Sequence, residues 1–66
     1  MEETYYYELT CPWKDKVGEE GFESYDDAYE AMTEAMTNII DEVAEQFPEM
    51  SDDEIERQIQ WEVRPE

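Results

Sequence analysis

Residues 25–46, YDDAYEAMTEAMTNIIDEVAEQ, carry the most regular pattern in the chain. Their apolar side chains recur at steps of three and four, the spacing that places them along one face of an α-helix. This apolar stripe consists of Tyr25, Ala28, Tyr29, Met32, Ala35, Met36, Ile39, Ile40, Val43 and Phe47. Ser24 precedes it as an N-cap, with Asp27 at the third position of a shortened capping box, and Pro48 follows as a helix breaker. We therefore predict one long helix over about 25–46, with an apolar face that must be covered.

Alternating segments near both ends of the chain predict the sheet that covers this helix. Residues 4–10 (TYYYELT) and 59–64 (IQWEVR) alternate as half-buried strands do. The apolar sides consist of Tyr5, Tyr7 and Leu9 in the first segment and of Ile59, Trp61 and Val63 in the second. Pairing of the two strands would place all six under the long helix.

The segments between these elements carry weaker patterns. Residues 13–21 (WKDKVGEEG) predict a loop or hairpin in which Gly18 and Gly21 make the turns, and residues 22–23 are a candidate short second strand. Ser51 and Glu54 form a capping box that predicts a short helix over about 52–58. The expected fold is a single α+β domain over residues 1–66. It has a small antiparallel sheet of two or three strands under one long and one short helix.

The composition is strongly acidic. There are 21 aspartates and glutamates against four lysines and arginines, which gives a formal net charge of −17, and there is no histidine. So much charge with low hydrophobicity can indicate disorder. Because 14% of the residues are aromatic and the apolar residues are regularly spaced, we predict a folded domain. Two carboxylates about 6 Å apart still repel by roughly 0.7 kcal/mol in water, so the acid excess opposes folding and requires another explanation.

The residue types argue against an enzyme. Acid–base catalysis near neutral pH usually employs histidine, and the single Cys11 has no basic neighbour that would favour a thiolate. We expect Cys11 to be a half-buried residue at a strand end. The paired acids Asp26–Asp27 and Asp52–Asp53 follow helix caps, where carboxylates favour the helix dipole, and their spacing is not that of a calcium loop. No metal or other cofactor is expected.

Location and partners follow from the same charge. The N-terminus is acidic where a signal peptide is basic, and no apolar run approaches the roughly 18 residues of a membrane span. An anionic surface is repelled by anionic lipids and by nucleic acid itself. We therefore expect a cytoplasmic protein that binds neither membrane nor nucleic acid directly.

The long helix is predicted to present acids opposite its apolar stripe. Asp26, Glu30 and Glu34 follow one another at four-residue steps, about 6 Å apart along the helix axis, and no basic residue of the helix balances them. The expected partner-binding acids are Asp26, Asp27, Glu30, Glu34, Asp41 and Glu45 on the helix, with Glu19, Glu20, Asp52, Asp53 and Glu56 outside it. Such a surface attracts a basic groove and displaces its counterions much as DNA does.

In length, acid excess and rows of helical carboxylates, the chain resembles the small DNA-mimic inhibitors of bacteriophages and mobile elements, the anti-CRISPR and anti-restriction proteins. The resemblance covers the whole chain in kind and involves no shared motif. It implies binding to the basic, DNA-binding surface of a host defence nuclease, such as a restriction enzyme or a subunit of a type I CRISPR surveillance complex. For a phage-encoded inhibitor, the compartment would be the host cytoplasm.

Two alternatives remain open. The acidity could be an adaptation of a salt-loving organism that marks no partner, since lysine is scarce. The chain could instead be an antitoxin-like interaction module that docks through exposed aromatic residues such as Tyr6 and Trp13, because aromatic anchors often carry interface energy.

Overall fold

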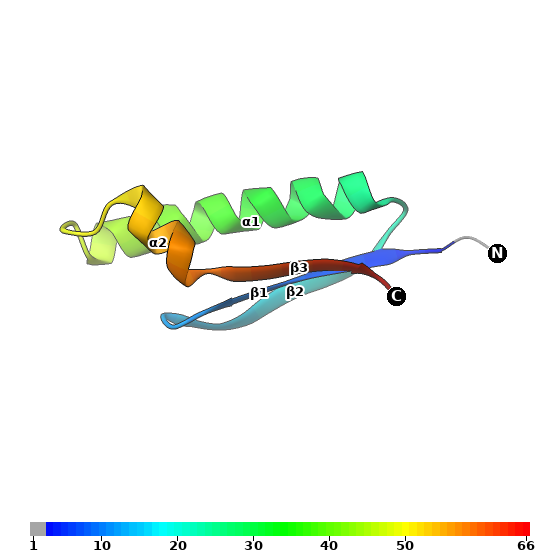
Figure 1. The fold of residues 1–66 in the computed structure, drawn as a ribbon, viewed down its shortest axis with the longest axis horizontal. Coiled ribbons are helices and arrows are strands. Elements are labelled where there is room, and N and C mark those ends of the chain that lie inside the picture. Colours follow the sequence, from blue (N-terminus) through cyan, green and yellow to red (C-terminus); the bar gives the residue numbers. More distant parts are fainter. Residues whose placement is uncertain (1–2) are drawn as a thin grey trace.

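The computed structural model describes residues 3–66, which form a three-stranded antiparallel sheet with a long helix lying along one face (Figure 1). The elements are β1 (Tyr5–Cys11), β2 (Lys14–Phe22), α1 (Tyr25–Gln46), α2 (Asp52–Gln58) and β3 (Gln60–Pro65). The strand order is β2-β1-β3, so the central strand is β1. The α+β prediction is confirmed.

Both predicted helix starts are confirmed by their caps. The Ser24 hydroxyl oxygen accepts a hydrogen bond from the backbone N–H of Asp27 at 3.1 Å, and Ser51 accepts one from that of Glu54 at 3.2 Å. These bonds satisfy donors that the first helical turn leaves free. α1 ends at Gln46, before Pro48, and α2 then folds back beside it and leads into β3 (Figure 1).

The second strand is longer than the sequence pattern predicts. Lys14–Phe22 forms a nine-residue strand, where a loop or hairpin with a strand at 22–23 was expected. The hairpin itself is present, but its turn lies at Pro12 and Trp13, and Gly18 lies within the strand. Gly21 does take a left-handed conformation, with φ of 86°. It lies where the register slips between the pairs Tyr5–Phe22 and Tyr7–Glu19, so it accommodates a bulge.

The core is a single layer between α1 and the sheet. β1 contributes Tyr7 and Leu9, and α2 contributes Ile55. The remaining buried apolar residues are Ala28, Met32, Met36, Ile39, Val43 and Ile59. β3 pairs with β1 in the register Tyr7–Val63 and Leu9–Trp61, so the predicted common face of these strands is confirmed. Cys11 ends β1 as a half-buried free thiol.

The molecule is elongated. Its principal extents are 48 × 18 × 15 Å and its radius of gyration is 13.0 Å, against about 11 Å for a typical globular chain of this length. One 22-residue helix laid along three strands gives this rod shape, and it leaves the sheet face opposite α1 uncovered (Figure 1).

Candidate functional site: the acidic face of α1

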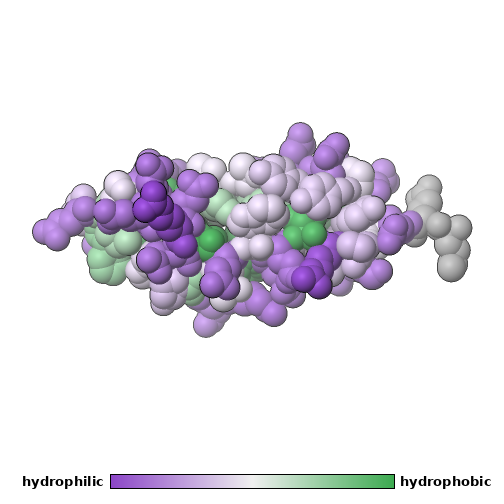
Figure 2. Space-filling model, in the orientation of Figure 1, coloured by the Kyte–Doolittle hydropathy of each residue, from purple (hydrophilic) through white to green (hydrophobic). Residues whose placement is uncertain are grey.

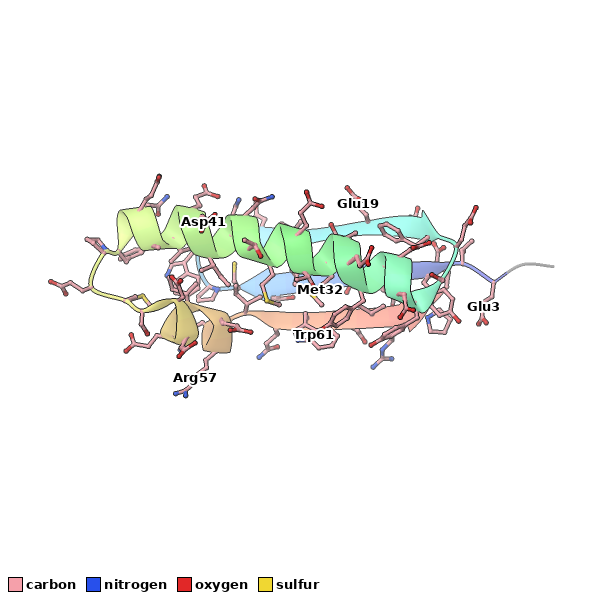
Figure 3. The ribbon with its side chains drawn as sticks, turned by 90° about the horizontal axis from the view of Figure 1, so that it is seen from above. Glu3, Glu19, Met32, Asp41, Arg57 and Trp61 are labelled. Atoms are coloured by element: carbon pink, nitrogen blue, oxygen red, sulfur yellow. The ribbon has the colours of Figure 1, made fainter. Side chains whose placement is uncertain are left out.

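Four acids of α1 form a row on the side of the helix that faces away from the sheet. Each follows a buried residue by two positions, which corresponds to about 200° around the helix. The pairs are Ala28 with Glu30, Met32 with Glu34, Ile39 with Asp41, and Val43 with Glu45. We call Glu30, Glu34, Asp41 and Glu45 the acidic row. In Figure 3, which looks down on α1 from the side away from the sheet, the labelled Asp41 is seen on the helix, whereas Met32 belongs to the buried core.

Within residues 3–66, no basic side chain forms an ion pair with this row. Three ion pairs occur among residues 3–66: Lys14 with Glu42, Lys16 with Glu8, and Arg64 with Glu62. Only the first reaches α1, and its acid lies on the β2 side of the helix, outside the row. The four acids of the row are exposed and have no ion-pair partner in the described part of the chain.

The remaining predicted site residues are exposed. Asp26 and Asp27 lie in the first turn of α1, four and three residues before Glu30, so they adjoin the acidic row at its start, whereas Glu20 lies on β2. α2 carries a separate group at the opposite end of α1: Asp52, Asp53 and Glu56.

Glu19, by contrast, is brought beside Glu34 of the acidic row, in a hollow that Tyr7 and Asn38 also line. The sequence did not indicate this approach of β2 to α1.

The negative charge around this hollow affects the pKa of Tyr7, which lines it. Burial of Tyr7, and then the nearby carboxylates of Glu19 and Glu34, raise the pKa of its phenol above the usual value of 10.0. Both causes disfavour a phenolate. Glu34 of α1 and Glu19 of β2 therefore both contribute to the negative potential at Tyr7.

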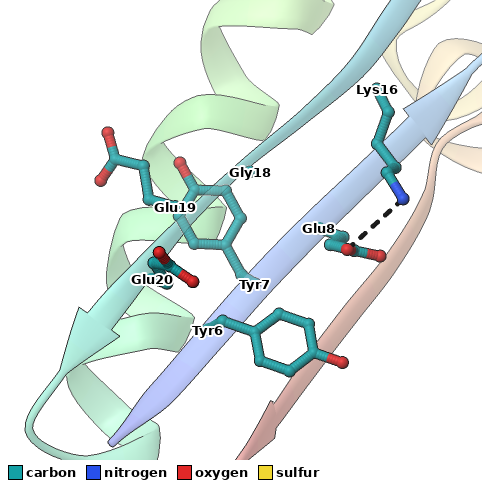
Figure 4. A pocket seen from close by; sticks show the side chains of 7 residues that line it. All are labelled: Tyr6, Tyr7, Glu8, Lys16, Gly18, Glu19 and Glu20. Carbon is teal, nitrogen blue, oxygen red and sulfur yellow. Dashed lines mark ion pairs between the residues drawn. The ribbon is translucent and has the colours of Figure 1, made fainter. Parts of the chain in front are cut away.

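The uncovered face of the sheet carries a different, mixed-charge hollow (Figure 4). It lies around Gly18 and is lined by Tyr6, Glu8, Lys16 and Glu20, among others. The Nζ atom of Lys16 lies 3.4 Å from a carboxylate oxygen of Glu8, so part of the charge is neutralised here. This hollow lacks the one-signed potential of the acidic row.

The exposed aromatic residues are not those expected from the sequence. Tyr6 and Trp13 are half-buried, and Trp13 packs against the core. The large apolar side chains that are exposed belong instead to Tyr25, Tyr29, Phe47 and Trp61. Tyr25, Tyr29 and Phe47 lie on the border of the apolar stripe of α1, and Trp61 lies on an outer strand of the sheet. The periodicity assigned all four to the core, because it does not show how far a single helix covers a sheet.

Among residues 3–66, no three His, Cys, Asp or Glu side chains come together as metal ligands. None of the described helices is long and apolar enough to span a bilayer. No protein-family model, curated protein or solved structure matches this chain.

Proposed function

We propose that the protein is a DNA-mimic inhibitor, which occupies the basic DNA-binding surface of a host defence nuclease and blocks access of the target DNA. The observation that carries the proposal is the acidic row: four exposed carboxylates on one helix, with no ion-pair partner in the described chain. A surface helix that served stability alone would gain from interleaved lysine or arginine.

The charge density of the whole molecule supports this proposal. Residues 3–66 include 20 of the 21 acidic residues and all four basic ones, a net −16 along a 48 Å rod. That is about one net charge per 3 Å, against one per 1.7 Å for duplex DNA and one per 3.4 Å for a single strand. The rod is 18 Å by 15 Å in cross-section. A basic groove that admits nucleic acid would therefore encounter a narrow molecule whose net charge per unit length is comparable to that of a DNA strand.

The expected partner is a cationic protein groove, such as that of a restriction enzyme or of a type I CRISPR surveillance complex. Steering by the anionic rod would accelerate the encounter, and release of anions from the groove would make binding sensitive to salt. The protein would need no catalytic group and no cofactor for this activity.

Charge reversal with a matched control tests the contact face. In one variant Glu30, Glu34 and Asp41 become lysine; in the control Glu3, Asp15 and Glu49, exposed residues outside α1, become lysine. Both variants change the net charge equally. Against purified nuclease complexes, we expect the row variant to lose at least about 100-fold in affinity and the control to lose far less. Equal losses would mean that only the net charge matters, and they would exclude the acidic row as the contact.

A further inference from the structure

Three exposed aromatic side chains gather in one place, between α1 and the outer strand β3. Tyr25 and Tyr29 stack with ring centroids 6.2 Å apart, and Tyr29 meets Trp61 edge-on at 5.6 Å. Their exposed fractions are 45%, 43% and 46%. Tyr5 extends the group, 6.4 Å from Tyr25. We call Tyr5, Tyr25, Tyr29 and Trp61 the aromatic cluster.

The fold explains why the cluster is left open. Trp61 pairs with Leu9, so its side chain is on the α1 side of the sheet, but β3 is the last strand on that side. α2 packs beside the C-terminal part of α1 and leaves the N-terminal part free (Figure 1). Figure 2 shows a pale, weakly polar band between α1 and β3, bordered by strongly hydrophilic residues. Figure 3 shows the labelled Trp61 at the outer side of β3.

The backbone beside the cluster has unused hydrogen-bonding groups. The N–H of Glu66 donates to the carbonyl of Thr4 at 2.8 Å, and these two residues are directly opposite in the β1–β3 register. Bonded and non-bonded pairs alternate in an antiparallel ladder. The backbone groups of Gln60, Glu62 and Arg64 therefore point toward β1. Those of Trp61 and Val63 point outward, and Pro65, which has no N–H, fills the next outward position.

The other edge of the sheet is less suited to accept a strand. β2 has two register irregularities along its pairing with β1, and its edge carries Lys14 and Lys16. Bulges, lysines and prolines are among the features by which natural sheets block an edge, and on β3 the residue of this kind at an outward position is Pro65, at the end of the strand. β3 pairs in continuous register from Thr10–Gln60 to Tyr5–Pro65. Trp61 and Val63 thus lie on an edge of the sheet that is regular and unpaired.

We propose that the β3 edge and the aromatic cluster together bind an extended, arginine-bearing segment of a protein partner, which adds as a fourth strand. Strand addition would use the outward groups of Trp61 and Val63, and alternate side chains of the segment would lie over the cluster. Arginine is the residue that fits, because its guanidinium group stacks on aromatic rings. Asp26 and Glu30 each lie one position beyond a cluster tyrosine, about 100° around α1, where they would attract the cation.

Charge decides between this occupant and a second copy of the chain. Two copies, each with a net charge of −17, would repel one another across a shared β3 edge. A cationic segment is attracted at the same place. The inference takes the partner's positive charge from the proposed function. Its strand edge and aromatic rings lie outside the acidic row, and the two surfaces share only Glu30.

Synthetic peptides test the inference without the nuclease. The probe is a blocked peptide of about nine residues that alternates arginine and threonine, so that all its arginines share one face as a strand. The comparison peptide is identical but carries N-methyl groups at alternate residues, which remove the donors of one edge. With the full chain, we expect the unmodified peptide to bind at least about tenfold more tightly, and the backbone N–H of Val63 to gain protection from hydrogen exchange. Equal affinities for the two peptides would overturn strand addition.

Two variants test the cluster. Tyr29→Ala removes its central ring, and we expect a loss of peptide affinity of at least about fivefold. Phe47→Ala removes a ring at the other end of α1 whose exposed fraction, 42%, is similar. We expect this variant to lose no peptide affinity. Equal effects of the two variants, or a dimer of the free protein that Tyr29→Ala dissociates, would overturn the proposal. If the peptide results hold but reversal of the acidic row leaves nuclease binding intact, the proposed function fails and this inference stands.

Discussion

The ammonium group of Lys14 on β2 lies 2.8 Å from a carboxylate oxygen of Glu42 on α1. The hydrogen bond from this ammonium group to Glu42, and then the charge of Glu42, raise the pKa of Lys14 above its usual value. This is the one ion pair that α1 makes within residues 3–66. Six of the seven acids of the helix thus remain available to a cation from outside, and several consequences can be measured.

Added salt is expected to stabilise the protein. The unpaired carboxylates of α1 repel one another, and screening shortens that repulsion from a range of about 30 Å at 0.01 M salt to about 3 Å at 1 M. We expect the melting temperature, measured by circular dichroism, to rise by several degrees across this range of salt concentration. The protein should nevertheless be folded at the lowest salt, because its core and both helix caps are complete. A chain unfolded below about 0.1 M salt would favour the halophile alternative instead.

Gly18→Ala is expected to destabilise the sheet. A Cβ atom at this position would lie 2.6 Å from the backbone carbonyl oxygen of Tyr7, so the backbone would have to shift. We expect a loss of about 1–3 kcal/mol in the free energy of unfolding, measured by urea denaturation. Asp15→Ala on the same strand is the control, since Asp15 is exposed. Unchanged stability of the Gly18 variant would contradict the close approach of β2 to β1.

Ile55→Ala is expected to detach α2. Ile55 is the buried residue of that helix, with 0% of its surface exposed. Its truncation should cost about 2–5 kcal/mol, a large fraction of the stability of so small a domain. Arg57→Ala, on the exposed side of α2, should change the midpoint of urea unfolding little. Equal midpoints for the two variants would contradict the packing of α2 on α1.

Alkaline pH is expected to weaken the fold through Tyr7. Its pKa in the folded protein is raised above 10.0, by burial first and then by Glu19 and Glu34. The stabilisation that this shift represents is therefore complete below the unfolded-state pKa of about 10, and it is lost as the pH rises through the folded-state value. In Tyr7→Phe, the fall in stability above about pH 10 should be smaller than in the parent protein. Identical alkaline profiles would contradict the assignment to Tyr7.

The helices could be predicted from the sequence because their determinants are local. Ser24, Ser51 and Pro48 mark helix ends by their own chemistry, and the structure places α1 and α2 over the predicted ranges. β2 was predicted less well. Its segment KDKVGEEGF has only Val17 and Phe22 as bulky apolar residues, and a bulge breaks the alternation between them. Its strand state depends on pairing with β1, which is a tertiary effect.

The candidate site was predictable to a similar degree. The acids opposite the buried stripe follow from helical spacing alone. That Glu19 approaches Glu34 depends on the register of β2, and the exposure of Trp61 depends on how far α1 and α2 cover the sheet. A strand pattern shows which face a side chain is on, but not whether its strand is at the edge.

Competition with DNA is the most direct test of the central claim. A nuclease complex that this protein binds is saturated with a labelled DNA duplex, and the unlabelled protein is titrated in at physiological salt. We expect the protein to displace the duplex, and the apparent affinity for the protein to fall in proportion to added competitor DNA. A ternary complex in which DNA and protein are bound together, with neither weakening the other, would contradict the claim.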